Sequence, residues 1–438
     1  MKKTIIVAAA AAGAVAAAVP AMALENEFHG MYKFMGYQGN FFDGQSPKLY
    51  ADAHSGFFAE QRARIQYTAK ANDNLKLVTH FELDSRFGGK NTSSGYLKTQ
   101  SGNDAGQLDA DSLTLETKNI YLDFNCPITG ANVKVGIQPW VDSYNALFLL
   151  ADTAGISASK KFGDVTATLA WFRPYDTTNG DGRGPGQFTT DLIVLDGKFA
   201  LNKDMKVGGS YYNIQDDASK LSYELLHVLG LNADLTFGPA TVKPFFLYEF
   251  GDYNANNDIS AFAFGATGKV KVANGAVNLA AFYLSGDKDG CATNDCDAYQ
   301  VVAAGYTYFN PANMWLLIRS GQAINSSTSI LSNDITVGGR GSLGLFAGYE
   351  GKVDKMFYNA NIGYMMANKE RGTEDAGIGT EINAQVGYKM FDNLSVSAAA
   401  AYAMLGDGMS KAGKTIAGKG VAGADDPYML NVQLSYSF

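Results

Sequence analysis

The chain has 438 residues and a net charge of −8, with 49 glycines, 24 tyrosines and 26 phenylalanines but only 10 prolines and 3 cysteines. The acidic balance argues against a nucleic-acid partner, which needs a basic face. After the first two dozen residues, no apolar run reaches the roughly 18 residues that a membrane-spanning helix needs. If the chain crosses a membrane, it therefore crosses as strands.

The first 23 residues have the pattern of a secretory signal peptide. Lys2 and Lys3 give a positive start, a run of small apolar residues follows from 5 to 19, and Ala21-Met22-Ala23 matches an A-x-A cleavage site. We expect cleavage after Ala23, so that residues 24–438 form a single domain. The loss of two lysines takes the net charge from −8 to −10. No cysteine follows the cleavage site, so a lipoprotein anchor is not expected.

Tight turns and longer polar stretches alternate along the chain. Turns rich in Asn, Asp, Gly or Pro are predicted at 72–74, 125–130, 162–164, 201–204, 237–239, 273–275, 309–313, 353–355 and 391–393. Longer loops are predicted at 41–56, 88–110, 140–152, 174–188, 215–222, 251–258, 285–297, 322–336, 367–378 and 406–426. Ten loops and nine turns predict an all-β, antiparallel transmembrane barrel of about 20 strands, with short periplasmic turns and long outer loops. A count of 16 or 18 stays open, because the segments at 131–139 and 153–162 are short.

Alternation within the strands predicts which face is which. Ile382, Val386 and Tyr388 share one face, while Glu381 and Gln385 share the other. In a barrel the apolar face meets lipid and the polar face lines a lumen, whereas a soluble sandwich with the same periodicity buries its apolar face in a core. The signal peptide, the final residue Phe438 and the contrast between loops and turns favour the barrel.

The second predicted hairpin, residues 60–86, carries the most charge on one face. Even positions include seven polar residues that we expect to line the lumen: Glu60, Arg62, Arg64, His80, Glu82, Asp84 and Arg86. A three-residue turn at 72–74 would set Arg64 opposite Glu82, Arg62 opposite Asp84 and Glu60 opposite Arg86. A shift of two residues would instead oppose like charges. This wall predicts a transverse field in a pore, and salt bridging that only keeps the wall flat is the alternative.

The third long connection, residues 138–152, is apolar and aromatic where a surface loop is expected to be polar. An apolar loop of this kind needs burial, and the barrel interior is available. We expect it to constrict the lumen through Trp140, Asp142, Tyr144 and Asp152, with the two aspartates facing Arg62 and Arg64. The alternative is a loop packed on the barrel rim or at a subunit contact.

The cysteines and histidines offer little further chemistry. Cys291 and Cys296 lie in one predicted outer loop, where an oxidising compartment favours a disulfide. The acidic residues of the same loop, 285–297, are a weak calcium hypothesis, because their spacing departs from that of a calcium-binding loop. We expect no other metal and no cofactor. The four histidines form no compact set with an acid and a nucleophile, so we expect no enzyme.

The last residues, 428–438, alternate apolar or aromatic with small polar side chains and end on Tyr436 and Phe438. They resemble the terminal assembly signal of outer-membrane barrels, which implies recognition by the barrel-assembly machinery. Together with the charged second hairpin and the third loop, this ending makes the chain resemble the outer-membrane porins of Gram-negative bacteria. The mature start at 24–30 and the segment 62–82 are similar to channel proteins of metal-respiring anaerobic bacteria.

The resemblance implies a passive channel for small hydrophilic solutes and ions, assembled as a homotrimer in the cell outer membrane. An acidic exterior suits lipopolysaccharide bridged by divalent cations. Two alternatives stay open. One is a substrate-selective channel, and the other is a barrel scaffold that sheathes a multihaem cytochrome or supports other surface proteins.

Overall fold

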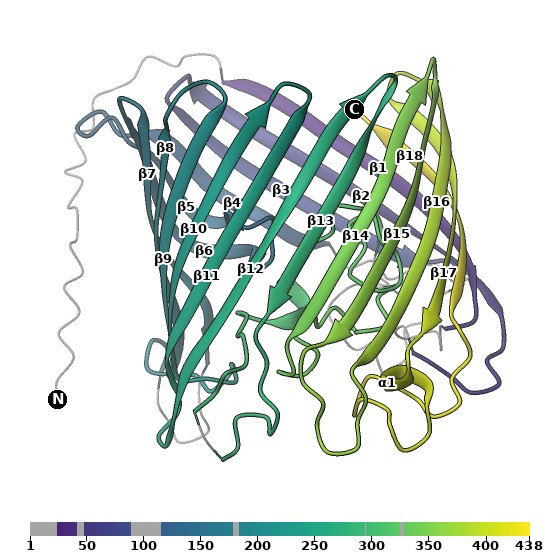
Figure 1. Ribbon diagram of the computed structural model, residues 1–438. Helices are drawn as coiled ribbons and strands as arrows, with labels where there is room; N and C mark the ends of the chain where they lie inside the picture. Colours follow the sequence, from purple (N-terminus) through teal and green to yellow (C-terminus); the bar gives the residue numbers. More distant parts are fainter. Residues whose placement is uncertain (1–23, 42–47, 89–114, 178–183, 294, 325–327) are drawn as a thin grey trace.

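The computed structural model describes residues 24–41, 48–88, 115–177, 184–293, 295–324 and 328–438. Within them, eighteen antiparallel strands form one closed barrel, in which each strand pairs with its neighbours in sequence and β1 also pairs with β18 (Figure 1). Closure removes the open sheet edges that would leave backbone groups unpaired in lipid. The expected signal peptide at 1–23 lies outside the described residues.

The strands have the following bounds: β1 (Glu25–Gly39), β2 (Gly56–Asn72), β3 (Leu75–Arg86), β4 (Glu116–Asn125), β5 (Asn132–Val141), β6 (Leu150–Phe162), β7 (Val165–Asp176), β8 (Thr189–Ala200), β9 (Met205–Asp216), β10 (Leu225–Phe237), β11 (Ala240–Asn254), β12 (Asn257–Val272), β13 (Gly275–Leu284), β14 (Ser342–Val353), β15 (Met356–Ala367), β16 (Gly377–Phe391), β17 (Leu394–Leu405) and β18 (Tyr428–Ser437). Two short helical pieces are η2 (Ala304–Tyr306) and α1 (Asp407–Ser410). In the described part of the chain, no helix is long and apolar enough to cross a membrane.

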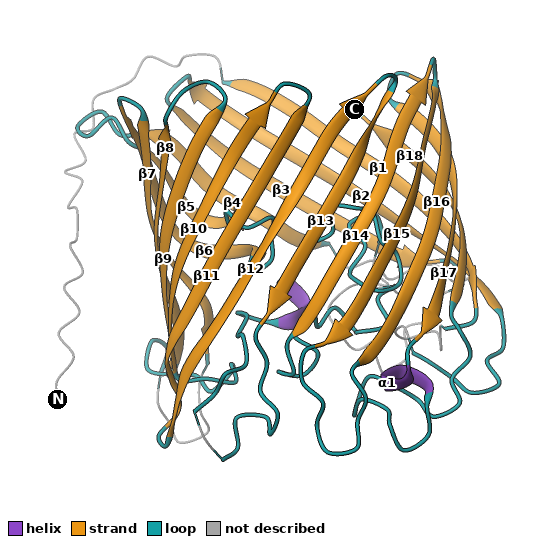
Figure 2. Ribbon diagram, viewed as in Figure 1, coloured by secondary structure: helices purple, strands orange, loops and turns teal. Residues whose placement is uncertain are grey.

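The two ends of the barrel differ in their connections. Short turns gather at one end and longer loops at the other (Figure 2). We number the nine connections at the loop end in chain order as loops 1 to 9, with residues 40–55, 87–115, 142–149, 177–188, 217–224, 255–256, 285–341, 368–376 and 406–427. The long loop predicted at 251–258 is wrong, because β11 and β12 extend into it and leave a turn of two residues. Eight of the nine turns predicted from the sequence lie at the short-turn end.

The prediction of about 20 strands is wrong by one hairpin. The remaining predicted turn, at 309–313, belongs to loop 7, which contains no β-strand among its described residues. Loop 7 instead enters the barrel, where Phe309 packs edge-to-face on Phe245 and Phe282 of the wall. Met314 to Ile318 are almost completely buried. An apolar segment is shielded from water both inside a filled barrel and against lipid. Hydrophobicity alone therefore did not distinguish a buried loop from a membrane strand.

The wall follows the predicted alternation. Along β16, the side chains of Ile382, Val386 and Tyr388 are exposed on the outer face, whereas Glu381 and Gln385 are buried inside. Large apolar side chains are exposed in the same way on the outer face of most strands. Such a belt is stable only against hydrocarbon, since roughly 25 cal/mol are lost for each Å² of apolar surface left in water.

Candidate channel constriction

A charged wall on β2 and β3 forms one side of the lumen. The ladder sets Arg62 opposite Asp84 and Arg64 opposite Glu82, which confirms the predicted register. Arg62 pairs bidentately with Asp84, at 2.7 Å from Nε to Oδ1 and 2.6 Å from Nη2 to Oδ2, and its Nη2 also reaches Glu82 at 3.0 Å. Arg64 forms an ion pair with Glu82. The fork geometry of the guanidinium groups therefore holds the four charges in one row.

The turn that sets this register differs from the predicted one. Asn72 pairs with Leu75 across a two-residue turn, and Ala71 is left out of the ladder as a bulge. The side-chain oxygen of Asn72 accepts a hydrogen bond of 2.8 Å from the N–H of Asn74, which closes the turn. The observed turn is one residue shorter than the predicted one, and the bulge at Ala71 compensates for this difference. All pairs further from the turn are therefore the predicted ones.

The predicted lining residues differ in their access to the lumen. The side chains of Arg62 and Arg64 are 15% and 28% exposed. Glu60, which lies opposite Arg86 in the ladder, and Asp84 are each only 1% exposed. The arginines therefore meet the lumen, while the two carboxylates lie behind them in the wall.

Other charged groups of the lumen come from β1, β4 and β6. Lys33 donates a hydrogen bond of 3.1 Å to the backbone oxygen of Gln322 in loop 7. Lys118 forms an ion pair with Asp152, whose second carboxylate oxygen accepts a hydrogen bond of 2.7 Å from Asn119. His80 lies beside Asn119 in the ladder. Lys33 and Lys118 were missed in the sequence, although the alternation used for residues 60–86 would have found Lys33.

The β5–β6 hairpin carries loop 3 away from the wall. The β4–β5 ladder ends at Ile120 opposite Ile137, whereas β5 and β6 stay paired as far as Val141 opposite Leu150. Tyr144 at the tip is fully buried. The free end of the hairpin therefore bends into the barrel, and Asp152 near its base meets Lys118 on β4.

Aromatic contacts fasten this hairpin to the inner face of the wall at β7 and β9. The ring of Trp140 lies 5.1 Å from that of Phe172, and Phe148 meets Tyr212 edge-to-face at 5.1 Å. The Tyr144 hydroxyl forms a hydrogen bond with Ser210. Trp140 and Tyr144 thus position the constricting loop, and they do not contact the charged wall.

Asp142 does not face Arg62 and Arg64, so this part of the prediction is wrong. Its carboxylate accepts hydrogen bonds from the four backbone N–H groups of Tyr144, Ala146, Phe148 and Leu149, at 2.7 to 2.9 Å. Burial raises the pKa of Asp142 to about 6, against the opposing effect of these donors. Asp142 therefore shapes loop 3, because a buried loop must satisfy its own backbone donors.

Loop 7 supplies groups that the sequence reasoning missed. The guanidinium of Arg319 lies 3.8 Å from the centre of the Tyr308 ring and donates to the backbone oxygen of Gly305. Burial lowers the pKa of Arg319, and the positive charge of Arg62 lowers it further. Tyr308 donates its N–H to the oxygen of Ala146 at 2.8 Å, so loop 7 rests on loop 3. Both residues fell in segments that were assigned to strands.

A single carboxylate on the wall holds the deepest part of loop 7. Glu381, fully buried on the inner face of β16, accepts hydrogen bonds from the N–H groups of Trp315, Leu316 and Leu317, at 2.7, 2.9 and 2.9 Å. Asn383 donates to the same carboxylate at 2.8 Å. Three consecutive backbone N–H groups thus donate to a side chain of the wall. A buried loop needs such acceptors, because it has no strand partner to pair with.

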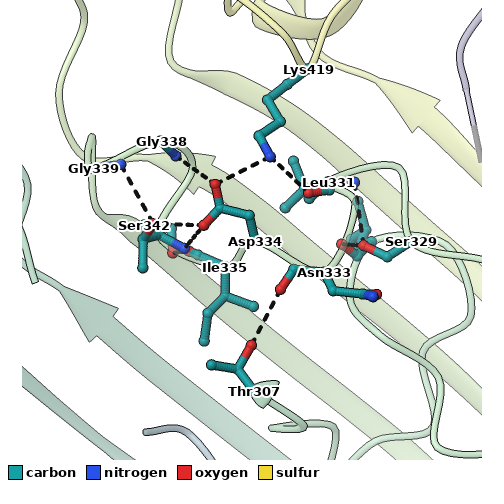
Figure 3. Close-up of polar contacts among 12 residues, drawn as sticks. Thr307, Ser329, Leu331, Asn333, Asp334, Ile335, Gly338, Gly339, Ser342 and Lys419 are labelled. Carbon is teal, nitrogen blue, oxygen red and sulfur yellow. Dashed lines mark hydrogen bonds and ion pairs between the residues drawn. The ribbon is translucent and has the colours of Figure 1, made fainter. Parts of the chain in front are cut away.

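The outer part of loop 7 is tied to loop 9 through one ion pair (Figure 3). Lys419 lies 3.1 Å from Asp334 and also donates to the oxygen of Leu331 at 3.0 Å. Asp334 accepts further hydrogen bonds from Thr336 and Gly338. Burial raises the pKa of Asp334, but the Lys419 charge and these donors outweigh it and hold the pKa below its usual value.

Loop 8 closes the same side. Arg340, which is 1% exposed, donates to the backbone oxygens of Lys369 and Asp375, at 2.6 and 3.1 Å, and lies 3.5 Å from Glu374. Glu374 in turn accepts from the N–H of Ala417 in loop 9 at 3.1 Å. Loops 7, 8 and 9 therefore form one connected cap at the loop end of the barrel.

Cys291 and Cys296 form a disulfide within loop 7. The Asp287 carboxylate, named in the calcium hypothesis, accepts hydrogen bonds from the N–H groups of Asp289 and Cys291 at 2.8 and 3.1 Å. In the described part of the chain, no group of three or more His, Cys, Asp or Glu side chains is placed to hold a metal. Asn294, another residue of that stretch, lies outside the described residues.

The terminal residues complete the barrel seam. Phe438 and Gly30 exchange two backbone hydrogen bonds, at 2.9 and 3.0 Å, just beyond the β1–β18 ladder. The rings of Tyr436 and Phe438 lie 5.6 Å apart on the outer surface. The alternation that suggested an assembly signal thus belongs to the strand that closes the barrel.

No protein-family model and no curated protein sequence matches this chain. Solved structures do match it in fold. A BenF-like porin from Pseudomonas fluorescens Pf-5 has a TM-score of 0.57 at 12% identity, covering 94% of this chain and 99% of that one. This chain has the fold of an outer-membrane porin.

Two further solved structures show the same likeness. OccK3 (OpdO) of Pseudomonas aeruginosa matches with a TM-score of 0.54 at 13% identity, over 94% of this chain and 96% of that chain. OccAB4 of Acinetobacter baumannii matches with a TM-score of 0.55 at 13% identity, over 94% and 98%. At these identities the porin likeness describes the fold, and the solute must be argued from the lumen of this chain.

Proposed function

We propose that this porin-fold protein is an outer-membrane channel for the passive diffusion of small hydrophilic solutes and ions. The observation that carries the proposal is the partial exposure of charged side chains inside the barrel. Arg62, Arg64, Lys118 and Asp152 are between 15% and 28% exposed although they lie in the lumen. A sealed barrel would bury these groups completely, and buried charges are costly. Loops 3 and 7 thus narrow the lumen without sealing it.

The charges at this opening support a transverse field. Arg62 and Arg64 line one side, and Arg319 and the aromatic ring of Tyr308 come from loop 7 on the other. Asp152 adds a carboxylate from the inward hairpin. Fixed charges at a narrow, low-dielectric passage act strongly on permeating ions. Ion preference is therefore a direct readout of this site.

A substrate-selective channel is the second candidate. The observation that favours it is the volume taken by loop 7, whose described buried residues at 309–324 and 328–331 fill the lumen with apolar side chains beside β11 to β18 and β1. A wide diffusion pore needs no such filling. The same filling disfavours the third candidate, a sheath around a multihaem cytochrome, because it occupies the space that such a partner needs.

Location and assembly belong to the same proposal. The exposed apolar belt and the expected signal peptide support insertion in the outer membrane, with the terminal strand as the signal for the assembly machinery. A homotrimer, contact with lipopolysaccharide and kinship with channels of metal-respiring anaerobic bacteria rest on the sequence resemblance. Cross-linking of the purified protein, followed by mass determination, tests the trimer.

The proposal is tested by single-channel recording of the purified protein in planar bilayers, with reversal potentials measured across a salt gradient. We expect stable conductance, and we expect the double substitution of Arg62 and Arg64 by alanine to shift the reversal potential toward cation preference. Lys203→Ala is the matched control, because this cation lies in a periplasmic turn and is 89% exposed. Absence of conductance in wild type would refute the channel.

An unchanged reversal potential in the double variant would refute the transverse field and leave the channel intact. Saturable block of the current by one solute, without block by others of similar size, would favour the selective channel over general diffusion. These outcomes separate the two candidates even while the natural solute is unidentified.

A further inference from the structure

The apolar belt of the outer wall is shorter on one side of the barrel than on the other. On β12 and β17, every outward side chain is apolar, aromatic or a glycine over residues 262–272 and 394–404, counted from the short-turn end. On β7 and β9, the same holds only over residues 165–171 and 205–211. A tilted strand crosses the hydrocarbon with roughly 9–11 residues. β12 and β17 meet this length, whereas β7 and β9 fall short of it.

Polar side chains lie on the outer face where the short belt ends. We call Arg173 on β7, Asp191 on β8, Asn213 on β9 and His227 on β10 the polar band. At the distance of His227 from the short turns, β12 carries Phe262, which is 38% exposed on the outside. Ionic and polar side chains are costly against hydrocarbon. Lipid chains therefore cover the wall at β12 well and the polar band poorly.

The groups of the polar band are already paired with one another. Arg173 donates to both carboxylate oxygens of Asp191, at 2.9 and 3.1 Å, and the two side chains are 29% and 25% exposed. The Nδ1 atom of His227 lies 2.8 Å from the Tyr211 hydroxyl and 3.3 Å from the Asn213 amide nitrogen. Because Asp191 neutralises Arg173, the band does not favour an anionic lipid headgroup. A second protein surface suits a neutral polar band better.

A hollow of about 820 Å³ lies in the outer face directly below the polar band. Gly197 and Gly209, which face each other in the β8–β9 ladder, line it, together with larger side chains such as Leu195, Leu229 and Phe246. Small residues let two membrane-embedded walls approach closely. A similar hollow of about 720 Å³ on β11 to β16 lies under the full-height belt, where acyl chains are sufficient to fill it.

We propose that the outer face of β7 to β11 is the contact surface for a second copy of this chain. Five strands about 4.8 Å apart, each roughly 33 Å long over about ten residues, present roughly 800 Å². A stable interface needs about 800 Å² from each partner. The neutral pair of Arg173 and Asp191 lets identical faces meet around a symmetry axis without like-charge repulsion. The proposal rests on the insertion in the outer membrane proposed above.

The mass of the purified protein in mild detergent, measured by light scattering, is the first readout. In wild type we expect a protein mass of at least two chains. Single-channel conductance of each variant is the second readout, because it shows that the barrel itself has folded. The two readouts are independent, so a loss of association is distinguished from a loss of the channel.

Filling the hollow tests the contact by shape. The double variant Gly197→Leu, Gly209→Leu should still fold, because a Cβ atom at these positions meets its nearest neighbours at 3.9 and 3.7 Å. We expect the oligomeric fraction to fall at least tenfold while conductance is retained. Gly268→Leu is the matched control, since it fills the hollow on β11 to β16 and its Cβ contacts are also at 3.9 Å. This control should leave the mass unchanged.

Reversing one charge of the polar band tests the contact by electrostatics. Arg173→Asp sets two carboxylates side by side on every copy, so we expect the oligomer to dissociate. Adding Asp191→Arg restores an opposite pair with its order exchanged, and we expect it to recover the oligomer. If Arg173→Asp does not assemble, the glycine variants still decide.

The outcomes separate this proposal from the channel function. A monomeric wild type overturns the interface, and one that carries bound lipopolysaccharide assigns the polar band to lipid instead. An oligomer that resists both the leucine and the charge variants, or that Gly268→Leu disrupts equally, places the contact elsewhere and also overturns it. A wild type without conductance refutes the channel, while its mass still decides the interface. Dissociation by leucine and by Arg173→Asp, with recovery in the exchanged pair, supports the proposal.

Discussion

The carboxylate of Glu381 on the barrel wall lies 2.7 Å from the backbone nitrogen of Trp315 in loop 7. With Leu316 and Leu317, this contact places three consecutive backbone donors on one buried acceptor. Loop 7 has no strand partner at this depth, so the wall carboxylate does what a sheet ladder would otherwise do. The position of the loop inside the barrel depends on this contact.

Glu381→Ala should loosen loop 7. The change leaves three buried N–H groups without an acceptor, each at a cost of about 1–3 kcal/mol. We expect a noisier and larger single-channel current and a lower midpoint of thermal unfolding. Glu381→Gln is the matched control, because its amide oxygen can still accept from up to two of these N–H groups, and its effect should be intermediate. Equal currents in all three proteins would contradict a structural role for Glu381.

Lys419→Met should free the outer part of loop 7 from loop 9. Lys419 and Asp334 are each 14% exposed in their side chains, so the pair is only weakly screened by water. We expect faster hydrogen exchange of the loop 7 amides around Asp334. Lys411→Met is the control, because Lys411 pairs with Asp407 at 3.0 Å in the same loop but is 55% exposed. Equal exchange in both variants would exclude the Lys419 contact as the anchor.

The contact between Asp334 and Lys419 should also depend on pH. Because the pKa of Asp334 is held below its ordinary value of 3.8, the stabilisation is complete above that pH and is lost as pH falls through the lower folded-state value. In Lys419→Met, burial is no longer offset by the ammonium, so the loss should begin at higher pH. Hydrogen exchange of loop 7, followed from about pH 2 to about pH 6, measures this loss in wild type and in Lys419→Met. The range covers roughly two units on either side of an ordinary carboxyl pKa.

Asp142 should give the opposite pH dependence. Its pKa is raised to about 6, so the folded protein holds a proton that the unfolded chain has already lost above pH 3.8. Loop 3 is therefore most stable below that value and loses on the order of 3 kcal/mol as pH rises to about 6. We expect current noise to increase across this window in wild type. Asp142→Asn should flatten the profile, and a variant that follows the wild-type profile would contradict the assignment.

Arg319→Ala should widen the opening from the loop 7 side. The guanidinium stacks on Tyr308, and the charge of Arg62 acts on it across the lumen. Removing it takes away both volume and positive charge, so we expect higher conductance together with a shift toward cation preference. Arg319→Lys should keep the ion preference but not the stacking. A variant that changes neither quantity would place Arg319 outside the ion path.

The sequence by itself predicted the barrel wall well. Strand alternation assigned the inner and outer faces, turn residues marked eight connections, and opposite charges predicted the pairing of Arg62 with Asp84 and of Arg64 with Glu82. These features are local, since they depend on residues close along the chain or facing each other across one turn. Short-range rules of period and charge are sufficient for them.

The interior was decided by the tertiary structure alone. Loop 7 carries the apolar character of a membrane strand but packs inside the barrel, because Glu381 and the inward rings of Phe245 and Phe282 form its partners there. Asp142 has the composition of a pore carboxylate but binds its own loop. In both cases the deciding partner is a backbone donor or a wall residue far away in sequence. The sequence shows that a segment is apolar. Only the closed barrel decides whether that segment lies in the wall or packs inside it.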